Sequence, residues 1–196
     1  MMKLRLCLFG MFLFAALILV PAASADDYQT FNLAWSGAYY SNSASATGQI
    51  TIDMSALNNP GYTEPLTVSA FTVTVTGADF GNGSYSLADY SYFFLGTNGG
   101  TLDFSQEVIG QSTSGDPWGT PSSGNGGDFN IASLDSAPLG TWYFTITPAG
   151  GDSGDHMLLT DFSPISDTPE PGSFILLGSG LAALAGMVRR KIGQRA

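Results

Sequence analysis

A stretch near the middle of the chain alternates strictly between apolar and polar side chains. In Ala70–Thr76, an extended backbone places Phe71, Val73 and Val75 on one face and the threonines on the other. Such alternation is typical of a strand with one face in a core and one in water. Similar segments, rich in β-branched and aromatic residues, are 30–39, 48–54, 90–95, 101–109, 128–134, 141–147 and 157–162. The pattern predicts about eight short strands.

Glycine-rich clusters separate several of these segments. Gly81–Gly83, Asn98–Gly100 and Gly150–Asp152 supply residues that tolerate the positive φ of tight hairpin turns. Many short strands joined by such turns are the pattern of an all-β domain. For residues 26–162 we therefore expect a β-sandwich or a jelly-roll-like fold.

Charge is distributed very unevenly along the chain. The six basic residues all lie at the two ends, and none occurs between Asp26 and Pro171. All 16 acidic residues fall in that interval, so its formal charge is −16 with His156 neutral. A nucleic-acid partner is excluded, because phosphate binding requires Lys and Arg. Solubility and mutual repulsion outside the cell explain the acidity most simply.

The N-terminus has the order of a secretory signal peptide. A basic region with Lys3 and Arg5 precedes an apolar run over 6–20, and the small residues Ala23 and Ala25 follow it. Signal peptidase accepts small side chains at positions −3 and −1, so this arrangement predicts removal of residues 1–25. The single cysteine lies inside the apolar run, so the mature chain would have no thiol or disulfide.

The C-terminus has three consecutive parts. Pro169, Glu170 and Pro171 close a linker over 163–173, and the prolines keep this motif extended. The uncharged run 174–188 would extend about 22 Å as a helix, and Gly172, Ser173 and the following arginines would help it to span a bilayer. The tail over 189–196 begins with the basic cluster Arg189, Arg190 and Lys191. Basic residues stay in the cytoplasm, so the acidic domain would lie outside.

Together these parts resemble the sorting signal of the PEP-CTERM family. The resemblance rests on Pro169–Glu170–Pro171, the apolar helix and the basic cluster over 189–191, about 25 residues in all. It implies recognition by exosortase, an integral-membrane enzyme that processes its substrates near this motif. It also implies a Gram-negative host that makes exopolysaccharide. An ordinary C-terminal anchor behind a chance Pro-Glu-Pro is the alternative.

Residues that could perform chemistry are few. His156 is the only histidine, and no G-x-S-x-G motif accompanies it, so catalysis by a Ser-His-Asp triad is not indicated. Zinc is not expected without cysteine and with one histidine. Calcium remains a weaker alternative, because carboxylates near glycine-rich turns can ligate it. The acids considered for it are Asp152, Asp155 and Asp161 around one turn, and Asp116 and Asp128 around a long loop. Some pair of carboxylates could also hydrolyse glycosides, without specific support.

A long Gly-, Ser- and Pro-rich segment over 112–127 contains Trp118. A surface loop is the simplest interpretation, and a ligand-contacting loop is the alternative. Trp35 and Trp142 lie in strand candidates and are expected in the core, which leaves Trp118 as the candidate for stacking on a sugar.

These observations favour one function over two others. We expect a non-enzymatic surface or extracellular-matrix protein, sorted and processed by exosortase and associated with exopolysaccharide. It would first be held in the inner membrane and then reach the cell surface or the medium. A carbohydrate-binding module is the second interpretation and a secreted hydrolase the third.

Overall fold

The structure is a computed structural model that describes residues 27–121, 125–134, 136–140, 143–148 and 155–165. The chain divides into two compact units, residues 1–164 and 165–196, and the described residues belong to the first except for Ile165. Several predicted features lie outside the described residues: Ala23, Ala25, the helix over 174–188, Pro169, Glu170, Pro171, Arg189, Arg190, Lys191, Trp142 and Asp152. Within the described residues, no helix is long and apolar enough to cross a membrane.

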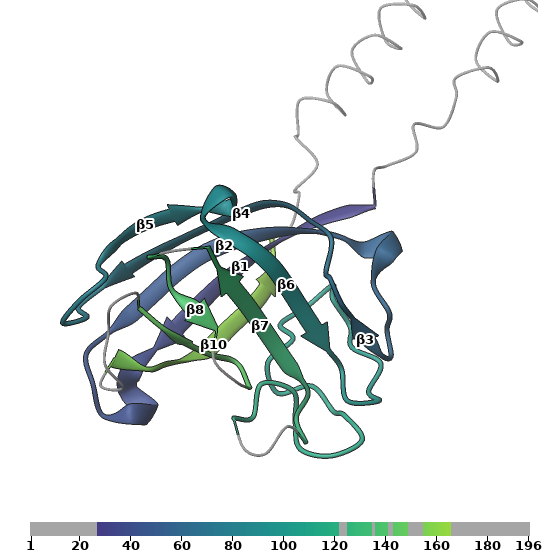
Figure 1. Ribbon diagram of the computed structural model, residues 1–196. Coiled ribbons are helices and arrows are strands. Elements are labelled where there is room, and N and C mark those ends of the chain that lie inside the picture. Colours follow the sequence, from purple (N-terminus) through teal and green to yellow (C-terminus); the bar gives the residue numbers. More distant parts are fainter. Residues whose placement is uncertain (1–26, 122–124, 135, 141–142, 149–154, 166–196) are drawn as a thin grey trace, which may run out of the picture. The chain divides into compact units, whose positions relative to one another are not determined.

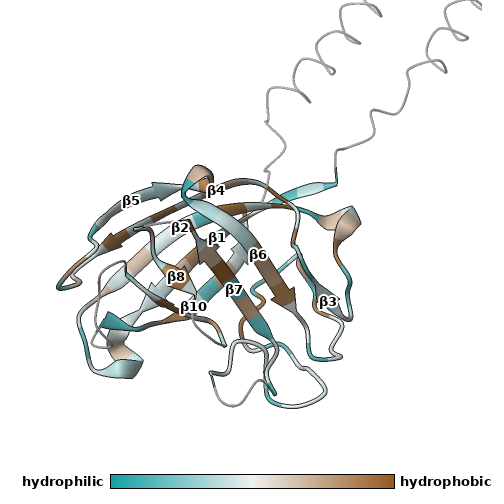
Figure 2. Ribbon diagram, viewed as in Figure 1, coloured by the Kyte–Doolittle hydropathy of each residue, from teal (hydrophilic) through white to brown (hydrophobic). Residues whose placement is uncertain are grey.

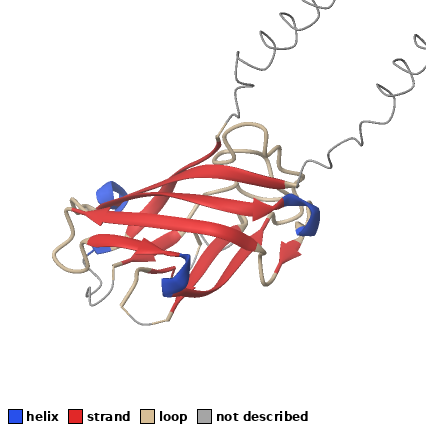
Figure 3. Ribbon diagram, turned by 90° about the horizontal axis from the view of Figure 1, so that it is seen from above, coloured by secondary structure: helices blue, strands red, loops and turns tan. Residues whose placement is uncertain are grey.

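The described part of the chain is built from antiparallel strands (Figure 1). The strands are β1 (Tyr28–Ser36), β2 (Ser45–Asp53), β3 (Tyr62–Thr63), β4 (Val68–Thr76), β5 (Gly83–Ser86), β6 (Tyr90–Gly96), β7 (Asp128–Ser133), β8 (Leu139–Gly140), β9 (Thr145–Thr147) and β10 (Met157–Pro164). Short 3-10 helices follow β1, β2 and β5: η1 (Gly37–Tyr40), η2 (Met54–Ala56) and η3 (Leu87–Asp89). Figure 3 shows these helices as single turns at strand ends.

The strands form two sheets. The larger has seven strands in the order β5-β4-β2-β1-β10-β9-β8, and the smaller has three in the order β3-β6-β7. The first and last long strands, β1 and β10, pair with each other in the larger sheet. In Figure 1, β6 and β7 cross in front of β1 and β2, so the small sheet lies against one face of the large one.

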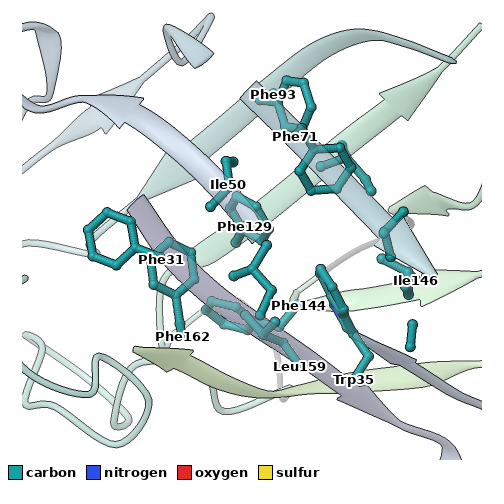
Figure 4. Packing of buried hydrophobic residues seen from close by; sticks show 14 of the residues in the cluster. Phe31, Trp35, Ile50, Phe71, Phe93, Phe129, Phe144, Ile146, Leu159 and Phe162 are labelled. Atoms are coloured by element: carbon teal, nitrogen blue, oxygen red, sulfur yellow. The ribbon is translucent and has the colours of Figure 1, made fainter. Parts of the chain in front are cut away.

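One hydrophobic core lies between the two sheets. Alternate residues of β1, β2 and β4 are buried, including Phe31, Ile50 and Phe71, because the period of a strand sends them to the same face. From the small sheet, Phe93 and Phe129 enter the same cluster (Figure 4). The colouring of Figure 2 shows apolar and polar residues interspersed along these strands. The aromatic rings pack mainly edge to face, as aromatic pairs prefer.

The prediction of an all-β domain is confirmed. Six predicted strand segments coincide with β1, β2, β4, β6, β7 and β10, with ends that differ by up to three residues. β10 reaches Pro164 instead of ending at 162, and the predicted segment 30–39 turns into η1 after Ser36. Of the segment 141–147, residues 145–147 form β9. The sequence did not reveal β3, β5 and β8, which are too short and too polar for a periodic pattern.

The predicted strand over 101–109 was wrong. Leu102, Phe104 and Val108 are buried as their spacing suggested, but the backbone forms turns instead of a ladder. The Asp103 carboxylate accepts hydrogen bonds from Ser105 N at 3.0 Å and Ser105 Oγ at 2.6 Å. Such local bonds between a side chain and the backbone compete with strand pairing. The apolar pattern correctly identified the buried residues. The polar residues between them determined the backbone conformation.

Candidate functional site

Trp118 is a core residue and not an exposed platform for sugars, which corrects the prediction. Its side chain has no exposed surface and packs edge to face on Phe144, with ring centroids 4.7 Å apart, and on Phe162 at 5.5 Å. Its indole Nε1 donates to the carbonyl oxygen of Gly96 at 2.9 Å. Trp118 thus anchors the middle of the segment 112–127 in the core. Burial of the large indole stabilises this position, and the bond to Gly96 satisfies its N–H.

His156 is held by neutral neighbours. Its Nδ1 lies 2.9 Å from Thr147 Oγ1, and its ring lies 5.5 Å from that of Tyr40. Its backbone carbonyl accepts a hydrogen bond from Asn42 Nδ2. A catalytic triad needs a carboxylate that orients the imidazole. Among the residues that the structure describes, no carboxylate is bonded to this ring.

Of the acidic residues considered as calcium ligands, Asp116, Asp128, Asp155 and Asp161 lie in the described part of the chain. Asp155 is buried and accepts a hydrogen bond from Asp79 N at 3.0 Å. Asp128 is bonded by Asn130 Nδ2 at 2.8 Å, and burial raises the pKa of its carboxyl against the lowering effect of nearby backbone amides. The described residues include no cluster of three or more acidic, histidine or cysteine side chains placed to hold a metal ion.

The carboxyl groups of Glu107 and Asp161 interact with each other. Glu107 Oε1 accepts hydrogen bonds from the backbone N–H of Ile109 and Phe162, both at 2.9 Å, and the two carboxyls share a hydrogen bond. Burial, followed by that bond, raises the pKa of Glu107. Carboxyls that hydrolyse glycosides stand about 5 to 9 Å apart with the substrate between them. This pair is in direct contact and instead ties the segment 101–109 to β10.

The outer face of the small sheet carries aromatic side chains that sequence reasoning missed. Tyr62 on β3 and Tyr92 and Phe94 on β6 point away from the core; we call these three residues the aromatic strip. Tyr62 is 60% exposed, and its ring stacks on that of Phe94, with centroids 6.0 Å apart and planes inclined by 24°. Tyr92 and Phe94 are partly buried. The sequence signal was the apolar run 90–95, which places aromatic residues on both faces of one strand.

The position of Tyr62 is set by its neighbours in the backbone. β3 pairs with the end of β6, where Tyr62 lies opposite Gly96. Thr97 closes the pairing, since its N–H donates to Gly61 O at 3.0 Å and its Oγ1 accepts from Gly61 N at 2.9 Å. Asn58 Nδ2 donates to Tyr62 O at 2.8 Å. These bonds hold the backbone that carries the most exposed ring of the strip.

Polar groups flank the aromatic strip. The Tyr92 hydroxyl donates to Glu64 Oε1 at 3.0 Å, and Glu64 is exposed. Burial and this carboxylate raise the pKa of Tyr92. On the other side, β7 pairs Asn130 with Phe94. The Asn130 amide is directed at Asp128, since its Nδ2 donates to Asp128 Oδ2 at 2.8 Å and its Oδ1 is buried. The face therefore combines flat apolar surface with the Glu64 carboxylate, a combination that can contact a sugar ring and a polar substituent.

The outer face of the large sheet carries mainly polar side chains, unlike the aromatic strip on the small sheet. Cross-strand neighbours here are hydroxyls and amides, such as Thr30 beside Thr51 at 2.9 Å and Gln49 beside Asn32 at 3.2 Å. A shallow hollow on this face is lined by Asn32, Ala34, Thr47, Gln49, Thr72 and Asp161, among others. The residues that line this hollow include no aromatic ring and one charged group, Asp161, so the hollow favours hydration over a particular ligand.

The comparisons with known proteins concern the end of the chain. A family model described as the PEP-CTERM protein-sorting motif matches residues 167–191. No curated protein and no solved structure matched the chain. A motif of this kind marks a protein that is exported through a membrane-anchored intermediate. The chain is therefore an exported protein that carries, in residues 167–191, a PEP-CTERM sorting motif, the recognition signal of exosortase.

Proposed function

We propose that the chain is a non-enzymatic component of the cell surface or extracellular matrix, processed by exosortase and associated with exopolysaccharide. The observation that carries this proposal is the sorting motif at residues 167–191 behind an acidic all-β domain. Removal of residues 1–25, a membrane helix over 174–188 and final release to the surface belong to the same proposal. So does a jelly-roll-like sandwich, which two facing antiparallel sheets support.

The test compares Glu170→Ala with the wild-type chain in the native host, by intact mass and cell fractionation. If exosortase reads the Pro-Glu-Pro, the variant keeps its tail and accumulates in the inner membrane. Asp79→Ala, which removes an exposed acid outside the motif, is the matched control and should behave like the wild type. The same mass and location for all three proteins would show that the motif is not read.

A carbohydrate-binding role is the second candidate, and the aromatic strip favours it. Exposed Tyr62 stacked on Phe94, with the exposed Glu64 carboxylate bonded to Tyr92 beside them, offers a surface for a pyranose ring. This surface replaces Trp118, which is buried. A secreted hydrolase has less support: Glu107 and Asp161, the carboxyls that interact within the described residues, share a hydrogen bond and are not held apart across a substrate.

A further inference from the structure

We propose that the aromatic strip binds a glycan with free amino groups, such as a polymer of glucosamine, and that Glu64 is the counter-ion of the bound ammonium group. The proposal deepens the carbohydrate-binding role and rests on it. Neither the sorting motif nor any comparison assigns a ligand to this face.

The rings of the aromatic strip are arranged to contact an extended ligand. Tyr62 and Phe94 are close to parallel, at 24°, so they present neighbouring rings with similar orientation. Tyr92 lies two residues before Phe94 on the same face of β6, which spaces the rings by roughly 7 Å along the strand. A row of rings on two adjacent strands, β3 and β6, suits an extended chain of sugar rings better than a single small molecule.

The charge of the domain is complementary to a cationic ligand. Between Asp26 and Pro171 the chain has no Lys or Arg, so an anionic polysaccharide would meet repulsion everywhere on the domain. At the strip, the Glu64 carboxylate is exposed and is oriented by the Tyr92 hydroxyl at 3.0 Å. A cation near this carboxylate also lies near the tyrosine rings, whose faces attract positive charge. An amino sugar offers both the apolar ring face and the ammonium group that this surface fits.

The affinity of the strip depends on the number of sugar units that it binds. An exposed ion pair and an exposed cation–π contact each contribute little, so a single sugar unit binds weakly. A polymer compensates by presenting many units to one strip and to many copies of the protein, which raises the overall affinity. The strip is therefore a matrix-binding surface and not a site for a free monosaccharide.

The experiment is a calorimetric titration of the full-length chain, purified in an uncharged detergent, at a pH at which glucosamine oligomers are protonated. Three β-1,4-linked oligosaccharides of equal length are compared: glucosamine, N-acetylglucosamine and glucose. We expect binding to be tightest for glucosamine and to weaken with added salt, because ions screen an exposed charge pair. Equal affinity for the glucose oligomer, or no binding of the glucosamine oligomer, would overturn the proposal.

Variants locate the site. Tyr62→Ala should weaken glucosamine binding about fivefold or more, and Glu64→Gln roughly two- to fivefold. Tyr39→Ala removes a ring that is 64% exposed and lies outside the strip, and Asp79→Asn removes an acid in the turn between β4 and β5. Both controls should bind like the wild type. Binding that survives Tyr62→Ala unchanged would also overturn the proposal. If Tyr62→Ala fails to fold, the affinity of Glu64→Gln for the glucosamine oligomer is the test, and unchanged affinity would overturn the proposal.

The outcome is independent of the test of sorting. A chain that binds no amino sugar can still be processed at Glu170, and a chain whose Glu170 variant is unchanged can still bind the oligomer. The two failures are therefore distinguishable.

Discussion

The ring of Tyr62 fills the space that a side chain on Gly96 would occupy: a Cβ at Gly96 would lie 2.7 Å from Tyr62 Cδ1. The same glycine accepts the indole N–H of Trp118 through its carbonyl oxygen. Gly96 thus connects the most exposed ring of the aromatic strip to the fully buried Trp118 of the loop 112–127. Substitutions at Gly96 and at Trp118 can separate these two roles.

Gly96→Ala should displace the Tyr62 ring and leave the core in place. The methyl group would meet the ring of an exposed side chain, which can turn away, and no positive φ at this position forbids alanine. We expect glucosamine binding to fall about as far as in Tyr62→Ala, with a loss of stability of about 1 to 2 kcal/mol. Calorimetry and thermal melting measure the two effects. Unchanged affinity would show that the position of the ring does not matter.

Trp118→Phe should reduce stability without changing glycan affinity. The substitution keeps an aromatic ring beside Phe144 but leaves the Gly96 carbonyl without its indole donor, at a cost of about 1 to 3 kcal/mol. Trp118→Ala should cost about 3 to 5 kcal/mol, because it also leaves a cavity. Denaturant unfolding gives both values. A lower glycan affinity of the folded Trp118→Phe variant would show that Trp118 contributes to binding.

Tyr90→Phe should stabilise the domain by up to about 1 kcal/mol. The Tyr90 hydroxyl is buried, has no hydrogen-bond partner among the described residues, and has a raised pKa chiefly because of burial. Removal of an unsatisfied buried hydroxyl recovers its desolvation cost. The matched control is Tyr85→Phe, which should destabilise, since the Tyr85 hydroxyl donates to Gly81 O at 2.9 Å. Thermal melting that shows both variants equally destabilised would contradict this.

Glu107→Gln should stabilise the domain at pH 7 but not near pH 4. The pKa of Glu107 is raised in the folded state by burial and by Asp161, so folding favours its protonated form. That contribution is complete below the unfolded pKa of about 4.3 and is lost as the pH rises through the raised value. Glutamine remains neutral and can still accept from Ile109 N and Phe162 N.

The Glu107→Gln effect should be small, below about 1 kcal/mol, because the carboxyl is only partly buried and much of the side chain remains exposed to solvent, which screens the charge. Melting curves of the variant and the wild type at pH 4 and pH 7 measure it. Asp79→Asn is the control, with no such pH-dependent difference expected. A gain from glutamine that is equal at both pH values would rule out proton linkage at Glu107.

The mature chain should begin at Asp26. Ala23 and Ala25 satisfy the small-residue requirement of signal peptidase after the apolar run over 6–20. Mass spectrometry of the exported protein from the native host should show the loss of residues 1–25. Ala25→Leu should block that cleavage, whereas Ser24→Leu, between the two recognised positions, should not. A surface form that retains Met1 would contradict the assignment.

Several parts of the fold could be predicted from local pattern alone. The alternation of Phe71, Val73 and Val75 indicated β4 and its buried face, because a strand has a period of two whatever it packs against. The pairing of β1 with β10 could not be predicted in this way, since it joins residues more than 120 positions apart. The turns over 101–109 could not be predicted either. The hydrogen bonds between Asp103 and Ser105 competed with the strand pairing that the apolar spacing suggested.

The sequence by itself determined the sorting motif over 167–191, the charge asymmetry and the all-β class, since each is a property of order along the chain. Tertiary structure alone decided the candidate site. Trp118 and Tyr62 both lie in glycine- and proline-rich surroundings, and nothing local shows that one is buried and the other is 60% exposed. Burial depends on which distant strands cover a residue: Phe144 and Phe162 enclose Trp118, whereas Tyr62 lies on the outer face of a sheet edge.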